Sequence, residues 1–315
     1  MRLCRIEFAG QCQAAFYDEA RIIPLATAAE QYRRLCDPAF PELKAEGLLP
    51  FLPHGALEPQ AQQLGRWLAE VHPPLPGIAT EEAHILVPLP HPPKIILLAG
   101  NYLEHIKEQG GMAAERERTF PYLFMKPPST TLNDPYRPVC VPRVAPAAVD
   151  WELELAVVIG RRCKNVPAAE ALNQVAGYTI INDISQRKFR PNPQRQKRER
   201  DVFFDWLHGK WFDTFCPCGP CITSARSIAD PQNLRLQLSL NGEIRQDGST
   251  SSMIFSIADI IAFITQIMTL EPGDMISTGT PSGVGNATGT YLKAGDVMLG
   301  TIEQIGTLKT VMCAE

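Results

Sequence analysis

Short alternations of apolar and polar residues mark the first part of the chain and predict a small β-rich region. Three alternating stretches predict three short strands joined by tight turns, at 3–8, 14–17 and 21–25. Apolar positions at helical spacing then predict two amphipathic helices, at 28–36 and 59–71. Proline-rich sequence follows and predicts an extended connection.

From Lys94 onward, predicted strands outnumber predicted helices. The apolar run 95–99, between Pro93 and Gly100, predicts a buried strand. The other predicted strands lie at 123–125, 139–141, 151–159, 177–181, 274–278, 297–302 and 308–312, with a hairpin at 234–246 around Asn241-Gly242. Helices are predicted at 101–109, 168–176 and 253–268. Because strands and helices do not alternate regularly, the pattern favours a β-rich α+β fold over a doubly wound parallel sheet.

The composition of the chain limits the possible partners and locations of the protein. The chain has 315 residues, of which 45% are hydrophobic and 20% charged, which is typical of an ordered globular protein. Its net charge of −4 gives no overall attraction to nucleic acid or anionic membranes. No secretory signal or membrane-spanning stretch is recognisable, and nine mostly scattered cysteines suggest reduced thiols. We therefore expect a cytoplasmic protein that binds neither nucleic acid nor a membrane.

Acidic residues gather in one predicted strand. Side chains alternate faces along 151–159, so Glu152 and Glu154 share a face, with Asp150 in line. Like charges one pleat apart repel, and a bound cation removes that cost. Asp183 follows another apolar strand, where a buried carboxylate needs a partner.

Such a carboxylate cluster, with no Cys or His nearby in the sequence, suits a hard ion: Mg²⁺ first, then Mn²⁺ or Ca²⁺. The alternative is a solvated acidic strand face with Asp183 as a turn or cap residue. The spacing alone favours neither interpretation.

Two further candidates for chemistry are a histidine and a lysine. His105 and Glu108 are three residues apart in a predicted helix, so they share a face and can hydrogen-bond. A carboxylate that orients a histidine raises its basicity, as a general base requires. The competing interpretation is a His–Glu pair on the protein surface. Without evidence from other segments, this surface interpretation is the favoured one. Lys210, between Gly209 and Trp211, would either face an anionic intermediate or extend over the surface.

Three other segments carry weaker signals. The glycine-rich stretch 277–285 would present backbone N–H groups, such as that of Gly279, and the Thr280 hydroxyl to a carboxylate, or form a long turn. Residues 187–200 carry seven Lys/Arg and one Glu; a solvated loop is favoured over a lid that attracts anionic substrates, and Arg187 is the candidate substrate contact. The trio Cys216, Cys218 and Cys221 lacks a fourth zinc ligand and is interpreted as reduced structural thiols.

Taken together, these segments resemble the fumarylacetoacetate hydrolase family over residues 94–312. The motifs that carry the resemblance, in order, are AGNYLEHIKE, FMKPPST, VDWELELAVVIGR, VAGYTIINDIS, GKWFDTFCPCGP, LNGEIRQ and LEPGDMISTGTPSGVG. One motif alone would be weak evidence for the resemblance, whereas the ordered set of motifs is specific for this family.

The resemblance implies a mixed β-sandwich or roll that usually assembles as a homodimer. It implies a small N-terminal β-rich domain with a helical linker (1–72), a proline-rich connection (73–93) and a catalytic domain (94–315). The family's metal ligands fall on Glu152, Glu154 and Asp183, and its His–Glu pair on His105 and Glu108. The resemblance also implies that Lys210 matches the family's lysine and that Thr280 matches its substrate-contacting threonine.

The resemblance also narrows the chemistry. The founding hydrolases have a further aspartate ligand just before the histidine, and 96–99 contains no acid here. The chain is therefore similar to the three-carboxylate branch, which includes acylpyruvate hydrolases, oxo-acid decarboxylases and isomerases. We expect a metal-dependent hydrolase that cleaves a C–C bond in a small anionic 1,3-dicarbonyl oxo-acid. The alternatives are decarboxylation or keto–enol isomerisation of an oxo-diacid at the same site, and a non-catalytic binding protein on the same scaffold.

Overall fold

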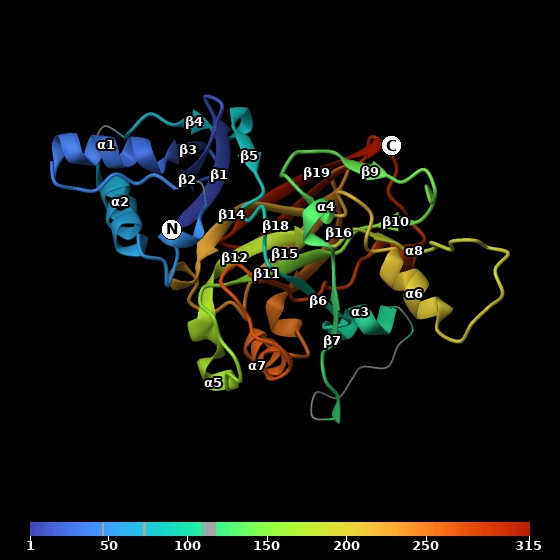
Figure 1. Cartoon of the computed structure of the whole chain (residues 1–315). Coiled ribbons are helices and arrows are strands. Elements are labelled where there is room, and N and C mark those ends of the chain that lie inside the picture. Colours follow the sequence, from blue (N-terminus) through green and yellow to red (C-terminus); the bar gives the residue numbers. More distant parts are fainter. Residues whose placement is uncertain (46, 72–73, 109, 111–117) are drawn as a thin grey trace.

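The computed structural model describes residues 1–315 except 46, 72–73, 109 and 111–117. Two large β-sheets and a set of flanking helices make up the molecule (Figure 1). Among the helices in the described ranges, none is both long enough and apolar enough to cross a lipid bilayer.

The N-terminal region is a small antiparallel meander with two helices beside it. Its elements are β1 (Arg2–Phe8), β2 (Gln11–Tyr17), β3 (Arg21–Pro24), α1 (Leu25–Leu35) and α2 (Glu58–Glu70). These strands and helices confirm the predicted ones. β1 also pairs antiparallel with β14 (Cys216–Ser224), so the meander continues a sheet of the main part of the molecule. One sheet therefore runs across the predicted domain boundary. The division into domains stays a prediction.

The larger sheet has the strand order β4-β3-β2-β1-β14-β12-β11-β17-β6-β7. Its further strands are β4 (Ile78–Ala79), β12 (Val175–Asn182), β11 (Leu153–Ile159), β17 (Met275–Ser277), β6 (Ile95–Ala99) and β7 (Tyr122–Met125), with β5 (His84–Leu86) on β1 and β8 (Leu132–Asn133) on β14. β6 and β17 are parallel, whereas β11 pairs antiparallel with both β12 and β17. Every residue of β11 and β12 is buried, as expected for strands covered on both faces.

The second sheet packs against the first and completes a mixed β-sandwich, as predicted. Its order is β16-β15-β18-β19-β9. The strands are β16 (Glu243–Ser249), β15 (Arg235–Leu240), β18 (Val297–Ile302), β19 (Gly306–Ala314) and β9 (Val139–Val141). A Cβ at Gly300 on β18 would lie 2.6 Å from Cδ1 of Leu153 on β11, so a glycine permits the two sheets to approach here. Leu153, Leu236 and Met298 then share one buried apolar cluster.

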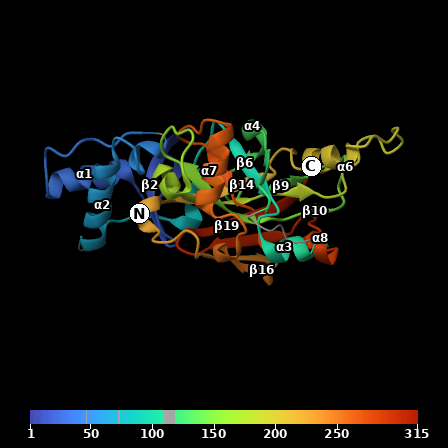
Figure 2. The same ribbon diagram turned by 90° about the horizontal axis from the view of Figure 1, so that it is seen from below.

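Helices lie around the sandwich. They are α3 (Leu103–Glu108), α4 (Pro128–Thr131), α5 (Ala168–Ala171), α6 (Asp201–His208), α7 (Ile257–Ile267) and α8 (Gly285–Thr288). Figures 1 and 2 place α6 at the end of the molecule opposite α1 and α2. α7 begins after Ser256, whose hydroxyl accepts the Asp259 N–H while the Asp259 carboxylate accepts the Ser256 N–H. This capping box explains why α7 starts later than the predicted 253–268.

Three further predicted elements differ from the structure at a boundary. The predicted strand 151–159 begins only at Leu153, after a separate short strand, β10 (Val149–Asp150), which pairs with β13 (Ser185–Gln186). The predicted helix 168–176 ends at Ala171, since a 3₁₀ turn at Leu172–Gln174 leads directly into β12. In the predicted helix 101–109, α3 begins at Leu103, and residue 109 lies outside the described residues.

Two of the longer elements were not predicted. β14 contains two prolines and a glycine, which disfavour strands, yet it lies fully buried between β1 and β12. α6 follows the basic run that the sequence indicated to be a solvated loop. Both elements depend on tertiary packing that the local pattern does not contain.

Candidate active site

Three carboxylates meet where β11 and β12 lie side by side. Glu152 immediately precedes β11, Glu154 lies on it, and Asp183 immediately follows β12. The antiparallel register pairs Glu154 with Ile181, and the Asp183 N–H donates to the Glu152 carbonyl at 2.8 Å. One carboxylate oxygen of each residue lies within 4.8 Å of the others, and all three side chains are buried. In the described ranges this is the one group of three or more His, Cys, Asp or Glu side chains close enough to hold a metal ion.

Cationic side chains surround this carboxylate cluster. Lys210 Nζ donates to Glu152 Oε2 at 2.7 Å and to Asp183 Oδ2 at 2.6 Å. Lys126 Nζ lies 2.7 Å from Asp183 Oδ1 and donates to the Ile184 carbonyl at 2.8 Å. Both lysine side chains are almost completely buried. The structure thus brings the predicted Lys210 to the predicted carboxylates.

Lys126 is a site residue that the sequence analysis missed. Its motif, FMKPPST, contributed only to the family resemblance. The signal that could have found it is a single lysine next to two prolines in otherwise apolar sequence, because a lysine that becomes buried there requires an acidic partner.

The charges around the cluster shift its acids in opposite directions. Burial alone would raise the pKa of Glu152, but the positive charges of Arg187 and Lys210 hold it below its usual value. Burial, together with the charges of Asp183 and Glu152, raises the pKa of Glu154 to about 8. The chain's own cations therefore neutralise the Glu152 side of the cluster and leave the Glu154 side short of positive charge.

The residues present fit a hard divalent cation. All three donors are carboxylate oxygens, which Mg²⁺, Mn²⁺ and Ca²⁺ prefer. Asp183 Oδ1 is buried and accepts no hydrogen bond of good geometry, although Lys126 lies beside it. A cation held by this cluster would supply positive charge and favour the ionised form of Glu154.

The predicted His–Glu pair forms on α3. His105 Nδ1 lies 2.7 Å from Glu108 Oε1. Because a carboxylate can only accept, the proton of this hydrogen bond is on Nδ1, and Nε2 is the basic nitrogen of the ring. The other carboxylate oxygen, Glu108 Oε2, accepts the Gly283 N–H at 2.8 Å, so the pair is fixed to the loop after β17.

One cavity of about 260 Å³ is lined by His105 of the His–Glu pair and by two of the three carboxylates, Glu152 and Glu154. Its lining includes His105, Glu152, Glu154, Arg187, Lys210 and Thr280. Ala99 and Gly100, at the end of β6, and Trp206, on α6, complete its wall. The cavity has room for a small ligand beside a metal ion, with His105 at one side.

The three predicted substrate contacts already have partners in the chain. Arg187 donates through Nε to Asp150 Oδ2 at 2.8 Å and through Nη2 to Glu152 Oε1 at 2.5 Å. The Thr280 hydroxyl donates to the Leu153 carbonyl at 2.8 Å. The Gly279 N–H donates to Glu154 Oε2 at 2.8 Å, beside the Ser277 hydroxyl at 2.6 Å. Arg187 and Thr280 line the cavity, and the substrate-binding role of all three stays a prediction.

The loop after β17 does present backbone N–H groups to carboxylates, as its glycine-rich sequence indicated, but these are the chain's own. Besides Gly279 and Gly283, Gly285 N donates to Asp150 Oδ1 at 2.6 Å. Asp150 is completely buried and also accepts hydrogen bonds from Asn286 and Arg187. Asp150 therefore connects this loop to Arg187 and does not belong to the carboxylate cluster.

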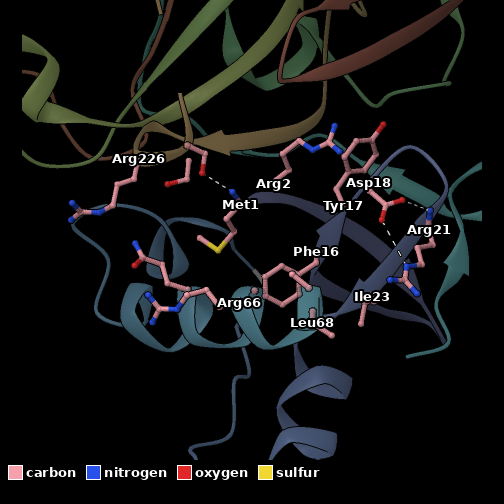
Figure 3. A pocket seen from close by; sticks show the side chains of 15 residues that line it. Met1, Arg2, Phe16, Tyr17, Asp18, Arg21, Ile23, Arg66, Leu68 and Arg226 are labelled. Carbon is pink, nitrogen blue, oxygen red and sulfur yellow. Dashed lines mark hydrogen bonds and ion pairs between the residues drawn. The ribbon is translucent and has the colours of Figure 1, made fainter. Parts of the chain in front are cut away.

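A roomier cavity of about 620 Å³ lies between the N-terminal meander, α2 and the end of β14 (Figure 3). Arg2, Arg21, Arg66 and Arg226 line it. Three of these arginines face acids: Arg2 pairs with Glu19, Arg21 with Asp18 and Arg226 with Glu58. It contains none of the carboxylate cluster, so the smaller cavity is the better candidate for catalysis.

Comparison with known proteins identifies the family of this chain. The sequence profile described as fumarylacetoacetate (FAA) hydrolase C-terminal matches residues 94–312. An uncharacterised protein of Pyrococcus abyssi is 45% identical over 224 residues, which is 71% of this chain and 92% of that protein. A human protein named oxaloacetate tautomerase FAHD2A, mitochondrial, is 39% identical over 236 residues, which is 74% of this chain and 71% of that protein.

Solved structures extend the similarity to the whole chain. A fumarylacetoacetate hydrolase from Exiguobacterium antarcticum superposes with a TM-score of 0.74 at 28% identity and covers 100% of both chains. A maleylpyruvate hydrolase from a Sphingobium species, solved with manganese(II) and pyruvate, superposes with a TM-score of 0.71 at 28% identity, covering 100% of this chain and 99% of the other. The chain belongs to the fumarylacetoacetate hydrolase family, whose members are metal-dependent enzymes.

Proposed function

We propose that this enzyme hydrolyses a C–C bond in a small 1,3-dicarbonyl oxo-acid of the acylpyruvate type, with the help of a divalent cation. The observation that carries the proposal is the shared cavity, which an oriented histidine lines together with Glu152 and Glu154, two members of the three-carboxylate cluster. A hard cation at the carboxylates suits a chelating 2-oxo-acid, and a neighbouring base suits the activation of water.

Glu152, Glu154 and Asp183 would hold the cation. When bound, the ion supplies Lewis-acid polarisation of the substrate's oxo and carboxylate oxygens. Mg²⁺ is the first expectation, and the manganese in a related maleylpyruvate hydrolase supports Mn²⁺ as an alternative. Arg187 lies at the cavity wall and would orient the anionic end of the substrate.

His105 would act as the general base. Its Nε2 takes a proton from a water molecule, and the resulting hydroxide attacks the carbonyl farther from the substrate's carboxylate. Glu108 stabilises the imidazolium that forms, because its carboxylate lies 2.7 Å from Nδ1.

Lys210 would stabilise the departing group. After the attack, the C–C bond breaks and its electron pair passes to an enolate, which later takes up a proton to give the 2-oxo-acid product. Burial alone would lower the pKa of Lys210, but Asp183 and Glu152 raise it above its usual value. The lysine therefore stays cationic near the enolate and contributes electrostatic stabilisation.

Keto–enol tautomerisation of an oxo-acid is a second candidate. The name of the human relative, oxaloacetate tautomerase, favours it. His105 would then move a proton between carbon and oxygen of the substrate, and no water would attack. Decarboxylation of an oxo-diacid remains a third use of the same groups.

Product analysis in ¹⁸O-labelled water separates these reactions. The purified protein would be assayed on acylpyruvates, oxaloacetate and other oxo-acids with Mg²⁺, with Mn²⁺ and with EDTA. We expect metal-dependent cleavage of an acylpyruvate with ¹⁸O in the carboxylate product. Turnover of oxaloacetate enol without cleavage would support the tautomerase, and no metal-dependent turnover of any compound would contradict both.

Two matched variants complete this test. Asp183→Asn removes a carboxylate of the cluster and should abolish metal-dependent turnover, whereas Asp213→Asn, at a position outside the cavity lining, should leave it unchanged.

We also expect a homodimer, which sedimentation measures directly. The cytoplasmic location stays a prediction, which localisation of the tagged protein in cells tests.

A further inference from the structure

An apolar cavity of about 520 Å³ adjoins the catalytic cavity. Ala99 and Trp206 line both. The rest of the described lining is apolar and rich in aromatic rings, which come from β7 and the segment leading into it, from α6 and from α7. These rings belong to Phe120, Tyr122, Phe124, Phe203, Trp206 and Phe263.

The rings form an ordered surface that faces solvent. Phe120 stacks on Phe263 with ring centroids 6.0 Å apart and meets Tyr122 edge-on at 5.5 Å. Phe120, Tyr122 and Phe203 nevertheless expose 59%, 67% and 54% of their surface. A contiguous patch of exposed aromatic side chains is typical of a binding site.

The boundary between the two cavities is a pair of aromatic side chains. Phe124 and Trp206 pack edge to face with centroids 5.0 Å apart. Lys210 Nζ, which contacts the carboxylate cluster, lies 5.0 Å from the Phe124 ring and 5.6 Å from the Trp206 ring. A ligand whose oxo-acid end lies at the cluster therefore meets these rings with its other end.

We propose that the aromatic cavity binds the acyl end of the substrate, and that this end is an apolar alkyl or aryl group. This inference rests on the proposed function and specifies its substrate. Among the residues that the structure describes, none that lines the aromatic cavity carries a charge. A second carboxylate, as in a fumaryl group, would lose its hydration against these apolar side chains, and the nearby Lys210 already pairs with Glu152 and Asp183.

Ligand length provides the quantitative expectation. Burial of each additional methylene should tighten binding about fourfold until the cavity is filled. A terminal carboxylate on a chain of equal length should weaken binding by about tenfold or more.

Binding to the Mn²⁺-loaded protein tests this without relying on turnover. Calorimetry would compare pyruvate, 2-oxobutanoate, 2-oxohexanoate and 2-oxooctanoate, with 2-oxoadipate as the acid-ended counterpart of 2-oxohexanoate. We expect affinity to rise along the alkyl series and 2-oxoadipate to bind more weakly than 2-oxohexanoate. Equal affinity along the series, no binding of the longer acids, or tighter binding of 2-oxoadipate would overturn the proposal.

Variants of the cavity wall show where the alkyl chain binds. Phe263→Ala should reduce the affinity for 2-oxooctanoate about tenfold or more while leaving that for pyruvate unchanged. Phe8→Ala is the matched control, because Phe8 is also a partly exposed aromatic residue, at 46%, but lies in the N-terminal meander. An unchanged preference for long chains in Phe263→Ala would contradict the assigned location.

A second copy of the chain is the competing occupant, since β7 is the last strand in the order of the large sheet. If Phe263→Ala changes the sedimentation mass and leaves the length dependence intact, the cavity is an interface and the proposal is wrong. The two proposals also fail separately. Hydrolysis with no length dependence removes only this inference, whereas length-dependent binding without hydrolysis removes only the proposed function.

Discussion

At the scale of single residues, the pair His105–Glu108 makes the sharpest prediction. His105→Ala should lower kcat by about 10²- to 10⁴-fold, because it removes the proposed general base. Glu108→Gln should lower kcat less, since it keeps the histidine but loses the charge that stabilises the imidazolium. Steady-state kinetics on the best substrate measures both effects.

Metal binding provides the internal control for this pair, because neither residue belongs to the carboxylate cluster. Both variants should bind Mn²⁺ with wild-type affinity in a calorimetric titration. His91→Ala, which replaces an exposed histidine, should leave kcat unchanged. Near-full activity of His105→Ala would show that another group takes the proton.

A second residue-scale prediction concerns pH and stability. Burial raises the pKa of the Cys221 thiol to about 12, whereas an unfolded cysteine titrates near about 8.5. Between these values the unfolded chain releases this proton and the folded chain keeps it. The stabilisation is therefore complete below about pH 8.5 and is lost as pH rises toward 12.

Denaturant unfolding at pH 9 to 11 would measure the effect, about 1.4 kcal/mol per pH unit for one thiol. Cys221→Ala should make the fall in unfolding free energy with pH shallower by about that amount. Cys12→Ala, at an exposed thiol, should leave the slope unchanged. Identical slopes for wild type and Cys221→Ala would contradict the prediction.

At the scale of elements, the loop between β17 and α8 orders the site. Its backbone N–H groups bind Glu154, Glu108 and Asp150, which belong to three different segments of the chain. Gly283 has a φ of +100°, and a Cβ there would lie 1.9 Å from the Arg245 carbonyl oxygen. Only glycine fits this position without moving the loop.

Gly283→Ala should therefore displace the N–H that holds Glu108 and lower kcat/KM by about 100-fold, since small shifts of catalytic groups are costly. Gly289→Ala is the matched control: its φ is +73°, but a Cβ there meets no atom within 4 Å. We expect it to cost about 1–2 kcal/mol of stability through backbone strain and to leave kcat/KM unchanged. Equal kinetics for the two variants would mean that the loop does not position Glu108.

Element boundaries were predictable where local pattern decides them. β1, β2 and β3 match their alternating sequence, and α1 matches its helical spacing. The interruption between β10 and β11 was not predictable, because it depends on β13, a partner more than 30 residues away. β14 escaped prediction for a related reason, since its burial between two strands outweighs the weak strand preference of its prolines and glycine.

At the scale of the whole molecule, the N-terminal region and the part that matches the family profile share a core. Leu3 from β1 and Phe51 pack in one buried apolar cluster with Val158 and Ile222 from the large sheet. β1 also pairs with β14 along the sheet. Removal of the N-terminal region would therefore expose both apolar surface and an unpaired strand edge.

We expect a fragment of residues 94–315 to aggregate or to unfold without cooperativity, although it contains every residue of the proposed site. Size-exclusion chromatography and thermal circular dichroism would show this, with the full chain as control. A monodisperse fragment with a cooperative transition would instead show that the two regions fold independently, as the predicted domain division implies.

The sequence by itself determined the features that depend on near neighbours and on motif order. The two-residue period of a strand placed Glu152 and Glu154 on one side, and the three-residue spacing on a helix paired His105 with Glu108. The ordered motifs identified the family. Each of these follows from backbone geometry over a few residues or from a comparison of sequences.

Only the tertiary structure decided which distant groups meet. It brought Lys126 to Asp183, directed the N–H groups of the loop after β17 toward the chain's own carboxylates, and placed Trp206 between a charged cavity and an aromatic one. These contacts join residues far apart in the chain. Their geometry is set by how the sheets and helices pack against each other, and no local period encodes that packing.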